Sequence, residues 1–534
     1  MTAPRRSLAC RIALSALLMT MPSIAAAAPP AGLADQIEQL RRDIGIPAVG
    51  ISIVEDGKIT FAKGFGVKRL GSTERVDADT IFPNGSTGKA FTVAALAVLV
   101  DQGKLKWDDR VIDHMPWFAM YDPWVTREMT VRDLLVHRSG LGLGQGDLLM
   151  VPRTNLTRRE SVQRLRFMKP ATSFRSAYAY DNILYMAAGQ LIEEISGETW
   201  EAFVAKHVLK PAGMTNSVSD SAPRFATANR AWPHARLNGP FRGVGDQSVL
   251  NERDELGRNA APAGGLAVSP NDMARWMLIQ LGHGKLPEGN GRLFSEAASA
   301  EMWKPVVPLP ISQLPGPLKD ASPNFDAYAL GWDVQDYKGA KIVSHSGAVF
   351  GFQALVVLIP EKNVGFTMLI NSEDGELIKG MQYVLLDHYL GKPTQDWPAA
   401  WRAFKRERQA RAIAALNQPS AQPAKVGPSL PQATYAGNYA DPWYGPISIR
   451  EEAGKLRIDF KQTPRMTGTL EHWQYDSFRT RWDDPAIEPA FVTFAIGPTG
   501  KIDRVTMKAV SPLVDFSWDY QDLLFTPVAA AAGK

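Results

Sequence analysis

The 534-residue sequence predicts a mixed α/β fold followed by a separate small antiparallel β domain. Strand-like apolar segments occur near both ends of residues 29–395, with mostly helical patterns between them, which indicates that the terminal segments share one sheet. After Gly391 the composition shifts to Pro, Ala, Gln and Ser, and later segments are short, aromatic and separated by turns. We therefore expect an α/β domain over 29–395, a helix and Pro/Ala-rich linker over 396–430, and an antiparallel β domain over 431–534.

The first segment has the features of a secretory signal peptide, which we assign to residues 1–28. Three arginines, Arg5, Arg6 and Arg11, precede an apolar run that ends in small residues. This run is shorter than the about 20 residues that span a bilayer, so we expect no membrane anchor after cleavage. The protein is therefore expected to be exported, either to the periplasm or out of the cell.

Removing this segment changes what chemistry is available to the chain. It removes Cys10, the only cysteine, and lowers the formal charge from +4 to +1. Thiol catalysis and thiolate metal sites are thereby excluded, and nothing indicates nucleic acid or an anionic membrane as partner. No pair of histidines has metalloprotease spacing, so we expect neither a metal nor a cofactor. Nothing in the sequence indicates a homo-oligomer.

The predicted α/β domain begins with a helix and a hairpin. The helix is indicated by an apolar stripe at helical spacing, made by Leu33, Ile37, Leu40 and Ile44. The hairpin turns at Asp56-Gly57, and its first strand carries Val49, Ile51 and Ile53 on one face.

The remaining elements follow from the same patterns. The stretch from Ser86 to Leu105 is apolar nearly all round, which predicts a buried helix. Residues 104–262 are mostly helical, three consecutive strands follow between 341 and 371, and a last helix runs to about Tyr389.

The stretch "NGSTGKAF", residues 84–91, has two interpretations. A phosphate-binding loop requires glycine five residues before the Gly-Lys pair and a hydroxyl residue after it, but Pro83 and Ala90 occupy these places. The alternative is a serine nucleophile, Ser86, with Lys89 three residues on and on the same helical face. The sequence favours the nucleophile.

A lysine can activate this serine only when its amine is neutral. A free lysine has a pKa of about 10.4 and would hold its proton. The apolar helix after Lys89 predicts a buried amine, and desolvation favours the neutral form. Lys89 can then accept the proton of Ser86.

Two further elements supply groups that suit such a site. The only Tyr-x-Asn, at Tyr180 and Asn182, precedes a predicted helix; a phenol can transfer a proton to a leaving group, and an amide can hold a substrate carbonyl. We prefer Tyr180 to its neighbour Tyr178, which lacks this asparagine.

The second element, His345-Ser346-Gly347, ends one strand and leads to the next. A strand edge at these three residues could bind an extended substrate, and a backbone N–H after Gly347 could join that of Ser86 to hold an oxyanion.

These three elements, in this order and at these separations, resemble the serine β-lactamase and penicillin-recognising superfamily. The resemblance is greatest to the branch with class C β-lactamases, D-aminopeptidases and related esterases, and it includes "TVRDLLVHRSGL", "LKPAGMTNS" and "PAGGLAVSPNDMARWM". It covers about Leu33 to Tyr389 and implies an antiparallel sheet with helices on both faces plus an all-helical lobe. The C-terminal part resembles the small β-barrel-like domains appended to some of these enzymes, and this layout resembles bacterial peptidases acting on linearised microcystin.

The resemblance also implies roles for individual residues. Ser86 would be the acylated nucleophile, and Lys89 and Tyr180 the proton-transfer pair. Asn182 would contact substrate, and the backbone N–H groups of Ser86 and Ala348 would form the oxyanion hole. The sequence does not show how the proton is divided between Lys89 and Tyr180.

One departure from the family pattern bears on the substrate. His345 stands where many β-lactamases carry the lysine of Lys-Thr-Gly, and a histidine with a pKa of about 6.5 is mostly neutral at pH 7. This weakens the case for β-lactam hydrolysis. We therefore expect a serine hydrolase acting on a small peptide, amide or ester, with peptidase or D-aminopeptidase-like activity first. The alternatives are a carboxylesterase or β-lactamase-type hydrolase, and a non-catalytic protein that binds penicillin or peptidoglycan.

Overall fold

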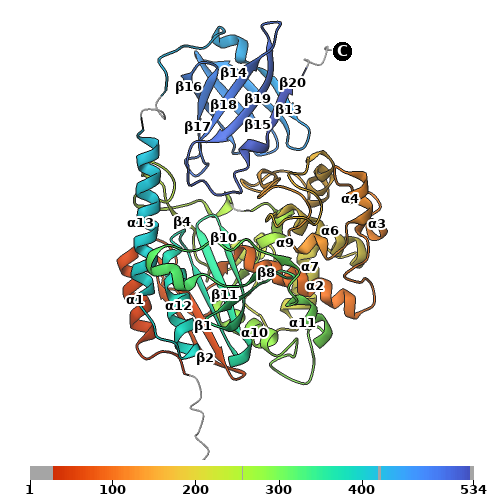
Figure 1. The fold of residues 1–534 in the computed structure, drawn as a ribbon, viewed down its shortest axis with the longest axis vertical. Coiled ribbons are helices and arrows are strands. Elements are labelled where there is room, and N and C mark those ends of the chain that lie inside the picture. The colour runs from red at the N-terminus through yellow and green to blue at the C-terminus, as the bar shows by residue number, and fades with distance from the viewer. Residues whose placement is uncertain (1–27, 255, 419–422, 529–534) are drawn as a thin grey trace, which may run out of the picture.

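The computed structural model describes residues 28–528, except residue 255 and residues 419–422 (Figure 1). Apart from Ala28, the predicted signal peptide lies outside the described residues. Within the described part of the chain, every helix is too short or too polar to cross a membrane.

The centre of the first domain is an eight-stranded antiparallel sheet, in which the strand that comes first in the chain pairs with the strand that comes last in the chain. In spatial order the strands are β2 (Lys58–Gly66), β1 (Ala48–Glu55), β12 (Val364–Ile370), β11 (Phe352–Ile359), β10 (Ala340–Val349), β9 (Asp333–Tyr337), β8 (Asp326–Tyr328) and β7 (Val307–Pro308). The register of Ile51 with Met368 confirms that the two ends of the domain share one sheet.

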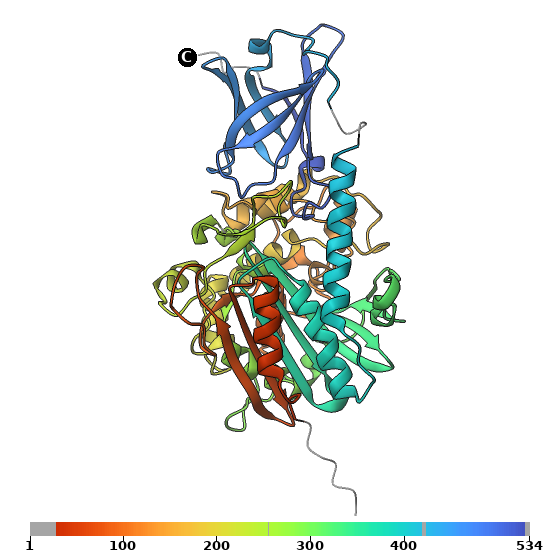
Figure 2. The ribbon, with the colours of Figure 1, turned by 90° about the vertical axis from the view of Figure 1, so that its left-hand side faces the viewer.

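Helices cover both faces of this sheet. One face is covered by α1 (Leu33–Ile44), α12 (Glu376–Leu390) and α13 (Trp397–Leu416) (Figure 2), and the other by α10 (Pro270–Leu281). Val49, Ile51 and Ile53 share the face that packs on α1 and α12, as their alternation predicts. The residues between them are buried as well, because α10 covers the opposite face.

An all-helical lobe is formed by the part of the chain that follows the first hairpin, β1 and β2, and largely precedes the remaining strands of the sheet. Its helices are α2 (Lys89–Asp101), α3 (Val111–His114), α4 (Pro123–Glu128), α5 (Arg158–Gln163), α6 (Ile183–Ser196), α7 (Trp200–Val204), α8 (Ser221–Ala226), α9 (Ala261–Gly264) and α11 (Glu296–Met302). Two short ribbons complete the domain, β3 (Phe82–Pro83) with β6 (Ala267–Val268) and β4 (His234–Arg236) with β5 (Gln247–Val249). The predicted buried helix is α2, in which ten of thirteen residues are buried.

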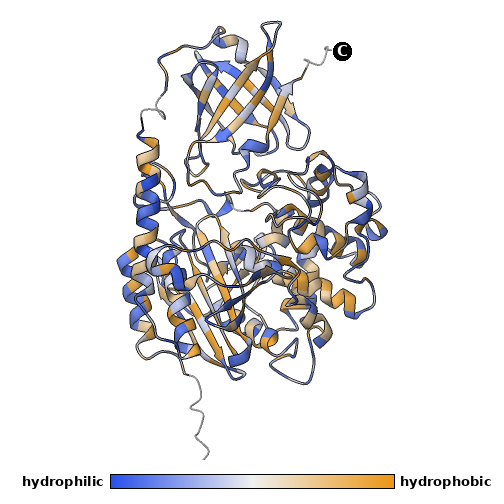
Figure 3. Ribbon diagram, viewed as in Figure 1, coloured by the Kyte–Doolittle hydropathy of each residue, from blue (hydrophilic) through white to orange (hydrophobic). Residues whose placement is uncertain are grey.

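The C-terminal domain is a closed antiparallel barrel. Its strands are β13 (Gly437–Asp441), β14 (Gly445–Glu452), β15 (Lys455–Phe460), β16 (Thr467–Gln474), β17 (Ser477–Trp482), β18 (Ala490–Ile496), β19 (Ile502–Ala509) and β20 (Leu524–Pro527). Hydrophobic and hydrophilic residues alternate along these strands (Figure 3), as expected when one face fills the barrel. The structure therefore confirms the predicted fold class, an α/β domain followed by a small β barrel.

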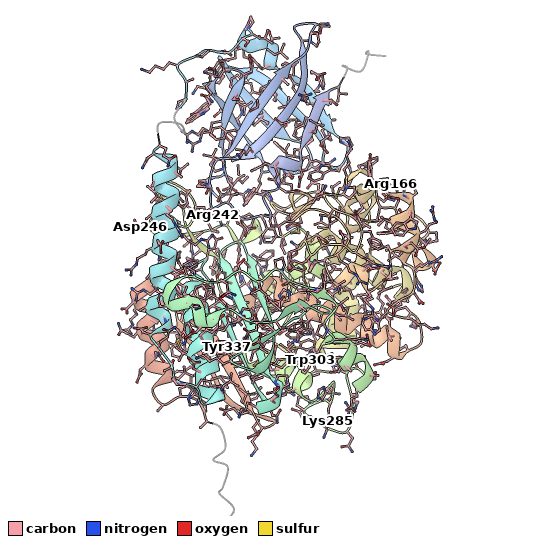
Figure 4. The ribbon with its side chains drawn as sticks, in the orientation of Figure 1. Arg166, Arg242, Asp246, Lys285, Trp303 and Tyr337 are labelled. Atoms are coloured by element: carbon pink, nitrogen blue, oxygen red, sulfur yellow. The ribbon has the colours of Figure 1, made fainter. Side chains whose placement is uncertain are left out.

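Direct contacts join the barrel to the first domain. The backbone N–H of Asn155 donates to the carbonyl of Gln462 over 2.9 Å. Arg242 lies at the junction of the domains (Figure 4), where its Nη1 donates to the carbonyl of Ala486 over 2.7 Å while its Nη2 pairs with Glu373 at 2.6 Å. The barrel is thus fixed against the hydrolase-like domain at several points.

Candidate active site

Ser86 and Lys89 occupy the start of the buried helix. Ser86 lies in a 3₁₀ turn, Gly85–Gly88, that leads directly into α2, and Lys89 is the first residue of that helix. This geometry points both side chains the same way, and Lys89 Nζ lies 3.0 Å from Ser86 Oγ.

The Lys89 amine is fully buried and has two further polar contacts. Nζ donates to Asn182 Oδ1 over 2.6 Å and to the carbonyl of Ala263 over 2.9 Å. Burial lowers the pKa of Lys89 to about 7, although the nearby carboxyls of Asp147 and Asp181 oppose this shift. When neutral, the amine donates its two N–H bonds to these oxygens, so its lone pair is left for the hydroxyl of Ser86.

Tyr180 lies beside this amine, just before α6. Lys89 Nζ is 4.8 Å from the centre of the Tyr180 ring. Burial raises the pKa of the Tyr180 phenol well above 10, and its hydrogen bond with Ser86 opposes this rise only in part. Tyr180 is therefore a neutral phenol beside the hydroxyl of Ser86. The ring of His137 packs against it, with 4.2 Å between ring centres.

Asn182, which the sequence predicts to contact substrate, also forms hydrogen bonds with two buried side chains. Its side chain is 5% exposed, its Oδ1 accepts from Lys89, and its Nδ2 donates to Asp147 Oδ2 over 2.9 Å. Burial raises the pKa values of both Asp147 and Asp181 to about 7. In this arrangement Asn182 orients the Lys89 amine.

Strand β10 passes directly against the turn that carries Ser86. A Cβ atom on Gly347 would lie 2.1 Å from the carbonyl oxygen of Asn84 and 2.9 Å from the backbone nitrogen of Ser86. A Cβ on Gly85 would lie 2.6 Å from the backbone nitrogen of Ala348. Only glycine allows this approach, which brings the two predicted oxyanion-hole segments together.

His345 lies at this strand edge but is not free to pair with a substrate carboxylate. Its Nδ1 lies 2.6 Å from the carbonyl of Ser346, which can only accept, so Nδ1 carries the hydrogen. Nε2 then accepts from the Tyr328 hydroxyl over 2.8 Å. Burial, followed by the nearby Lys89, lowers the pKa of His345 to about 3, so the ring is neutral.

A large cleft opens over these residues. It has a volume of about 890 Å³ and is lined by Ser86, Tyr180, Asn182 and the strand from His345 to Val349. One wall belongs to the C-terminal domain, since Leu513 to Trp518 line the same space. Lys89 lies beneath this surface.

The family assignment follows from a comparison with known protein families. The Beta-lactamase family matches residues 33–389, which is more than half of the chain. The chain belongs to the Beta-lactamase family. A domain of unknown function, DUF3471, matches residues 421–527. The protein is therefore a β-lactamase-family serine hydrolase with a DUF3471 barrel.

The chain is similar in sequence to a hydrolase and to a penicillin-binding protein, and similar in fold to solved structures. Unguisins hydrolase ungD from Aspergillus violaceofuscus is 27% identical over 478 residues, which cover 81% of this chain and 79% of that protein. Penicillin-binding protein 4 from Amycolatopsis lactamdurans is 26% identical over 345 residues, 63% of this chain and 84% of that one. Among solved structures, the octameric penicillin-binding protein homologue from Pyrococcus abyssi has a TM-score of 0.58 at 21% identity and covers 89% of this chain and 97% of that one. This last likeness concerns the fold alone.

The β-lactamase-family site also contains groups that the sequence did not reveal. His137, which the sequence does not mark as a site residue, packs on Tyr180, and Asp147 and Asp181 lie near Lys89. Asp147 follows a glycine-rich stretch, "GLGLGQG", that has no catalytic signature of its own. No local pattern identifies these residues, because their role depends on which distant segments pack against them.

Proposed function

We propose that this protein is a peptidase that hydrolyses peptide amide bonds through an acyl-enzyme on Ser86. The observation that carries the proposal is the placement of a fully buried lysine amine 3.0 Å from the Ser86 hydroxyl, beside a neutral phenol. The amine takes the serine proton, and the serine oxygen attacks the substrate carbonyl. The N–H groups of Ser86 and Ala348 then hold the oxyanion.

The shifted pKa values divide the proton-transfer roles. Lys89, with a pKa of about 7, is the base that accepts the proton of Ser86. Tyr180, whose pKa lies well above 10, stays protonated and relays a proton from the Lys89 ammonium to the departing amine. The C–N bond breaks as the amine nitrogen takes this proton. Water then attacks the ester on Ser86: Lys89 accepts a proton from the water and returns it to the Ser86 oxygen as the bond to the acyl carbon breaks and the carboxylic acid leaves.

Two features support peptide amides as the substrate class. An amine leaving group must be protonated to depart, and a neutral phenol beside Ser86 can supply that proton. The alcohol of an activated ester can depart without a proton, so it gains less from this phenol. The cleft volume of about 890 Å³ has room for a substrate of several residues. The similarity to a protein named as a hydrolase of unguisins supports hydrolysis, without fixing this chain's substrate.

The engaged state of His345 argues against β-lactams as the main substrate. Both of its ring nitrogens have partners and its pKa is lowered to about 3, so it offers no positive charge to a substrate carboxylate. Recognition along β10 then rests on backbone groups, which suit an extended peptide.

A substrate panel tests this proposal. D- and L-aminoacyl anilides, longer peptidyl anilides, short-chain nitrophenyl esters and nitrocefin are offered to the wild type and to Ser86→Ala. We expect turnover of anilides with a kcat/KM that exceeds that for nitrocefin, and no turnover by Ser86→Ala. Turnover of esters alone would make the protein an esterase, and turnover of nitrocefin alone a β-lactamase.

A fluorophosphonate probe, which labels activated serines, separates an enzyme from a binding protein. Labelling of the wild type that disappears in Ser86→Ala supports the acyl-enzyme. A folded wild type that is not labelled would be a non-catalytic penicillin- or peptidoglycan-binding protein.

A further inference from the structure

The barrel contributes a loop to the catalytic cleft. This loop, residues 510–519, joins β19 to a short 3₁₀ turn, Tyr520–Asp522. Its dark blue trace lies between the barrel and the hydrolase domain (Figures 1 and 2), and its residues from Leu513 to Trp518 line the cleft that contains Ser86. The loop is therefore placed to act on the catalytic groups.

Buried contacts hold this loop in place. The carboxyl of Asp519 is fully buried and accepts from the backbone N–H groups of Gly146 and Leu148 over 2.7 and 2.9 Å. Gly144 comes so close to the loop that a Cβ atom there would lie 2.6 Å from the carbonyl oxygen of Phe516. The Phe516 ring in turn packs edge-on against Tyr180, with 5.7 Å between ring centres. The loop and residues 144–148 thus form one packed unit.

A chain of hydrogen bonds leads from this loop to the base. Ser517 Oγ donates to Asp147 Oδ2 over 2.8 Å, and the same oxygen accepts from Asn182 Nδ2 over 2.9 Å. Asn182 Oδ1 then accepts from Lys89 over 2.6 Å. Among the described residues, nothing hydrogen-bonds to the other, buried oxygen of Asp147, so Ser517 and Asn182 are the two groups that donate to this carboxyl, both at Oδ2.

The direction of these bonds determines how Asn182 faces Lys89. While Asp147 is a carboxylate it can only accept, which turns the NH₂ of Asn182 toward it and leaves the oxygen for Lys89. The hydroxyl of Ser517 favours this charged form, because it donates to a buried carboxyl whose pKa burial raises. Without that donor, a protonated Asp147 can donate to the amide oxygen instead. The amide would then turn its NH₂ toward Lys89. The only acceptor of a neutral lysine amine is its lone pair, which already accepts from Ser86, so this contact would be unfavourable.

We propose that Ser517, on the loop of the C-terminal barrel, is a positioning residue of the catalytic site that orients Asn182 toward Lys89 through Asp147. The barrel is then a constituent of the active site and not a separate binding module. The inference rests on the proposed function, because its test measures acylation of Ser86.

The test compares three full-length variants with the wild type. Ser517→Ala removes the donor and Ser517→Thr keeps it. Ser477→Ala is the matched control, since it removes an exposed barrel hydroxyl whose partner is Thr493. The rate constant for fluorophosphonate labelling and the Tm are measured for each. We expect labelling of Ser517→Ala to slow about tenfold, with recovery in Ser517→Thr to within about twofold of wild type and no change in Ser477→Ala.

The other outcomes overturn the proposal in distinguishable ways. Equal labelling of Ser517→Ala and wild type would show that the loop does not act on the base. Slower labelling that threonine does not restore would assign Ser517 a packing role only. A wild type that is not labelled at all defeats the proposed function and the positioning role with it. Amide hydrogen exchange at Gly146 and Leu148 tests the docked loop independently of catalysis, and exchange as fast in the wild type as in Asp519→Ala would show that the loop is not docked.

Discussion

The Nζ atom of Lys89 lies 4.8 Å from the centre of the Tyr180 ring, and burial shifts the pKa values of these two groups in opposite directions. The amine loses its proton more readily than a free lysine, while the phenol holds its proton more firmly than a free tyrosine. At pH 7 the phenol is therefore neutral, and about half of the amine is unprotonated. Desolvation disfavours the charged forms of both groups, and in the proposed mechanism the neutral amine is the base and the phenol the proton donor for Ser86.

The lowered pKa of Lys89 predicts the pH dependence of acylation. Below about pH 7 the amine holds a proton and cannot accept that of Ser86, so the rate of fluorophosphonate labelling should rise with pH and level off above about 7. Asp181→Asn should move the midpoint to lower pH, because the Asp181 carboxyl raises the pKa of Lys89. A rate that rises only above about pH 9 would mean that Lys89 keeps the pKa of a free lysine and is not the base.

The neutral phenol predicts a different response from two neighbouring tyrosines. Tyr180→Phe removes the proton donor beside Ser86 and should lower kcat/KM for an anilide about a hundredfold, with a smaller loss for a nitrophenyl ester whose leaving group needs no proton. Tyr178→Phe is the matched control, since its ring also lines the cleft. Equal losses for anilide and ester in Tyr180→Phe would remove this phenol from the leaving-group step.

The core of the proposed catalytic site could be outlined from sequence because each of its parts has a local sequence signal. Ser86 and Lys89 are one helical turn apart, and the order of the Tyr-x-Asn and His-x-Gly elements resembles a known superfamily. The fold class followed from the alternation and helical spacing of apolar residues, which the sheet and the barrel confirm. Such patterns are set within a few residues of sequence and need no knowledge of distant contacts.

The environment of that core could not be predicted in the same way. Asn182 is predicted to contact substrate and lines the cleft, but its contacts with Lys89 and Asp147 were not expected. His345 has Tyr328 and the carbonyl of Ser346 as partners. Each of these contacts except the last joins segments far apart in the chain, and local patterns carry no information on such pairs. The entry of Ser517 into the cleft is the extreme case, because it crosses a domain boundary.

The buried imidazole of His234 predicts that stability decreases in mild acid. Nδ1 donates to the carbonyl of Asn371 over 2.9 Å and Nε2 accepts from the N–H of Leu70 over 3.0 Å, an arrangement that requires the neutral ring. Burial lowers the pKa from 6.5 to about 4, so between these values the unfolded chain binds more protons than the native one. The free energy of unfolding should therefore fall by about 2 kcal/mol from this group alone as the pH drops from about 7 to about 5.

Urea unfolding at both pH values checks this contribution. In His234→Gln the loss between the two pH values should be smaller than in wild type by about 2 kcal/mol. His472→Gln, which removes an exposed imidazole from the barrel, is the matched comparison. An unchanged pH dependence in His234→Gln would show that the ring titrates alike in the folded and unfolded chains.

The contact between β10 and the nucleophile turn predicts that a single methyl group will disable the site. In Gly347→Ala the new Cβ would lie 2.1 Å from the carbonyl oxygen of Asn84 and 2.9 Å from the backbone nitrogen of Ser86, both of them backbone atoms that cannot rotate away. The strand must therefore separate from the turn, which moves the N–H groups of Ser86 and Ala348 apart. Labelling should slow by about a hundredfold or more, since loss of one oxyanion donor alone costs that much.

The matched control is Gly427→Ala, where a Cβ would meet nothing within 4 Å. It should leave both labelling and the Tm unchanged, whereas Gly347→Ala should also lose about 1–3 kcal/mol of stability through overpacking. The decisive comparison is between the rate and the stability of Gly347→Ala. In Gly347→Ala the displaced strand can no longer place the Ala348 N–H against the oxygen of the acyl group. A folded variant that is labelled at the wild-type rate would therefore show that β10 does not supply the oxyanion hole.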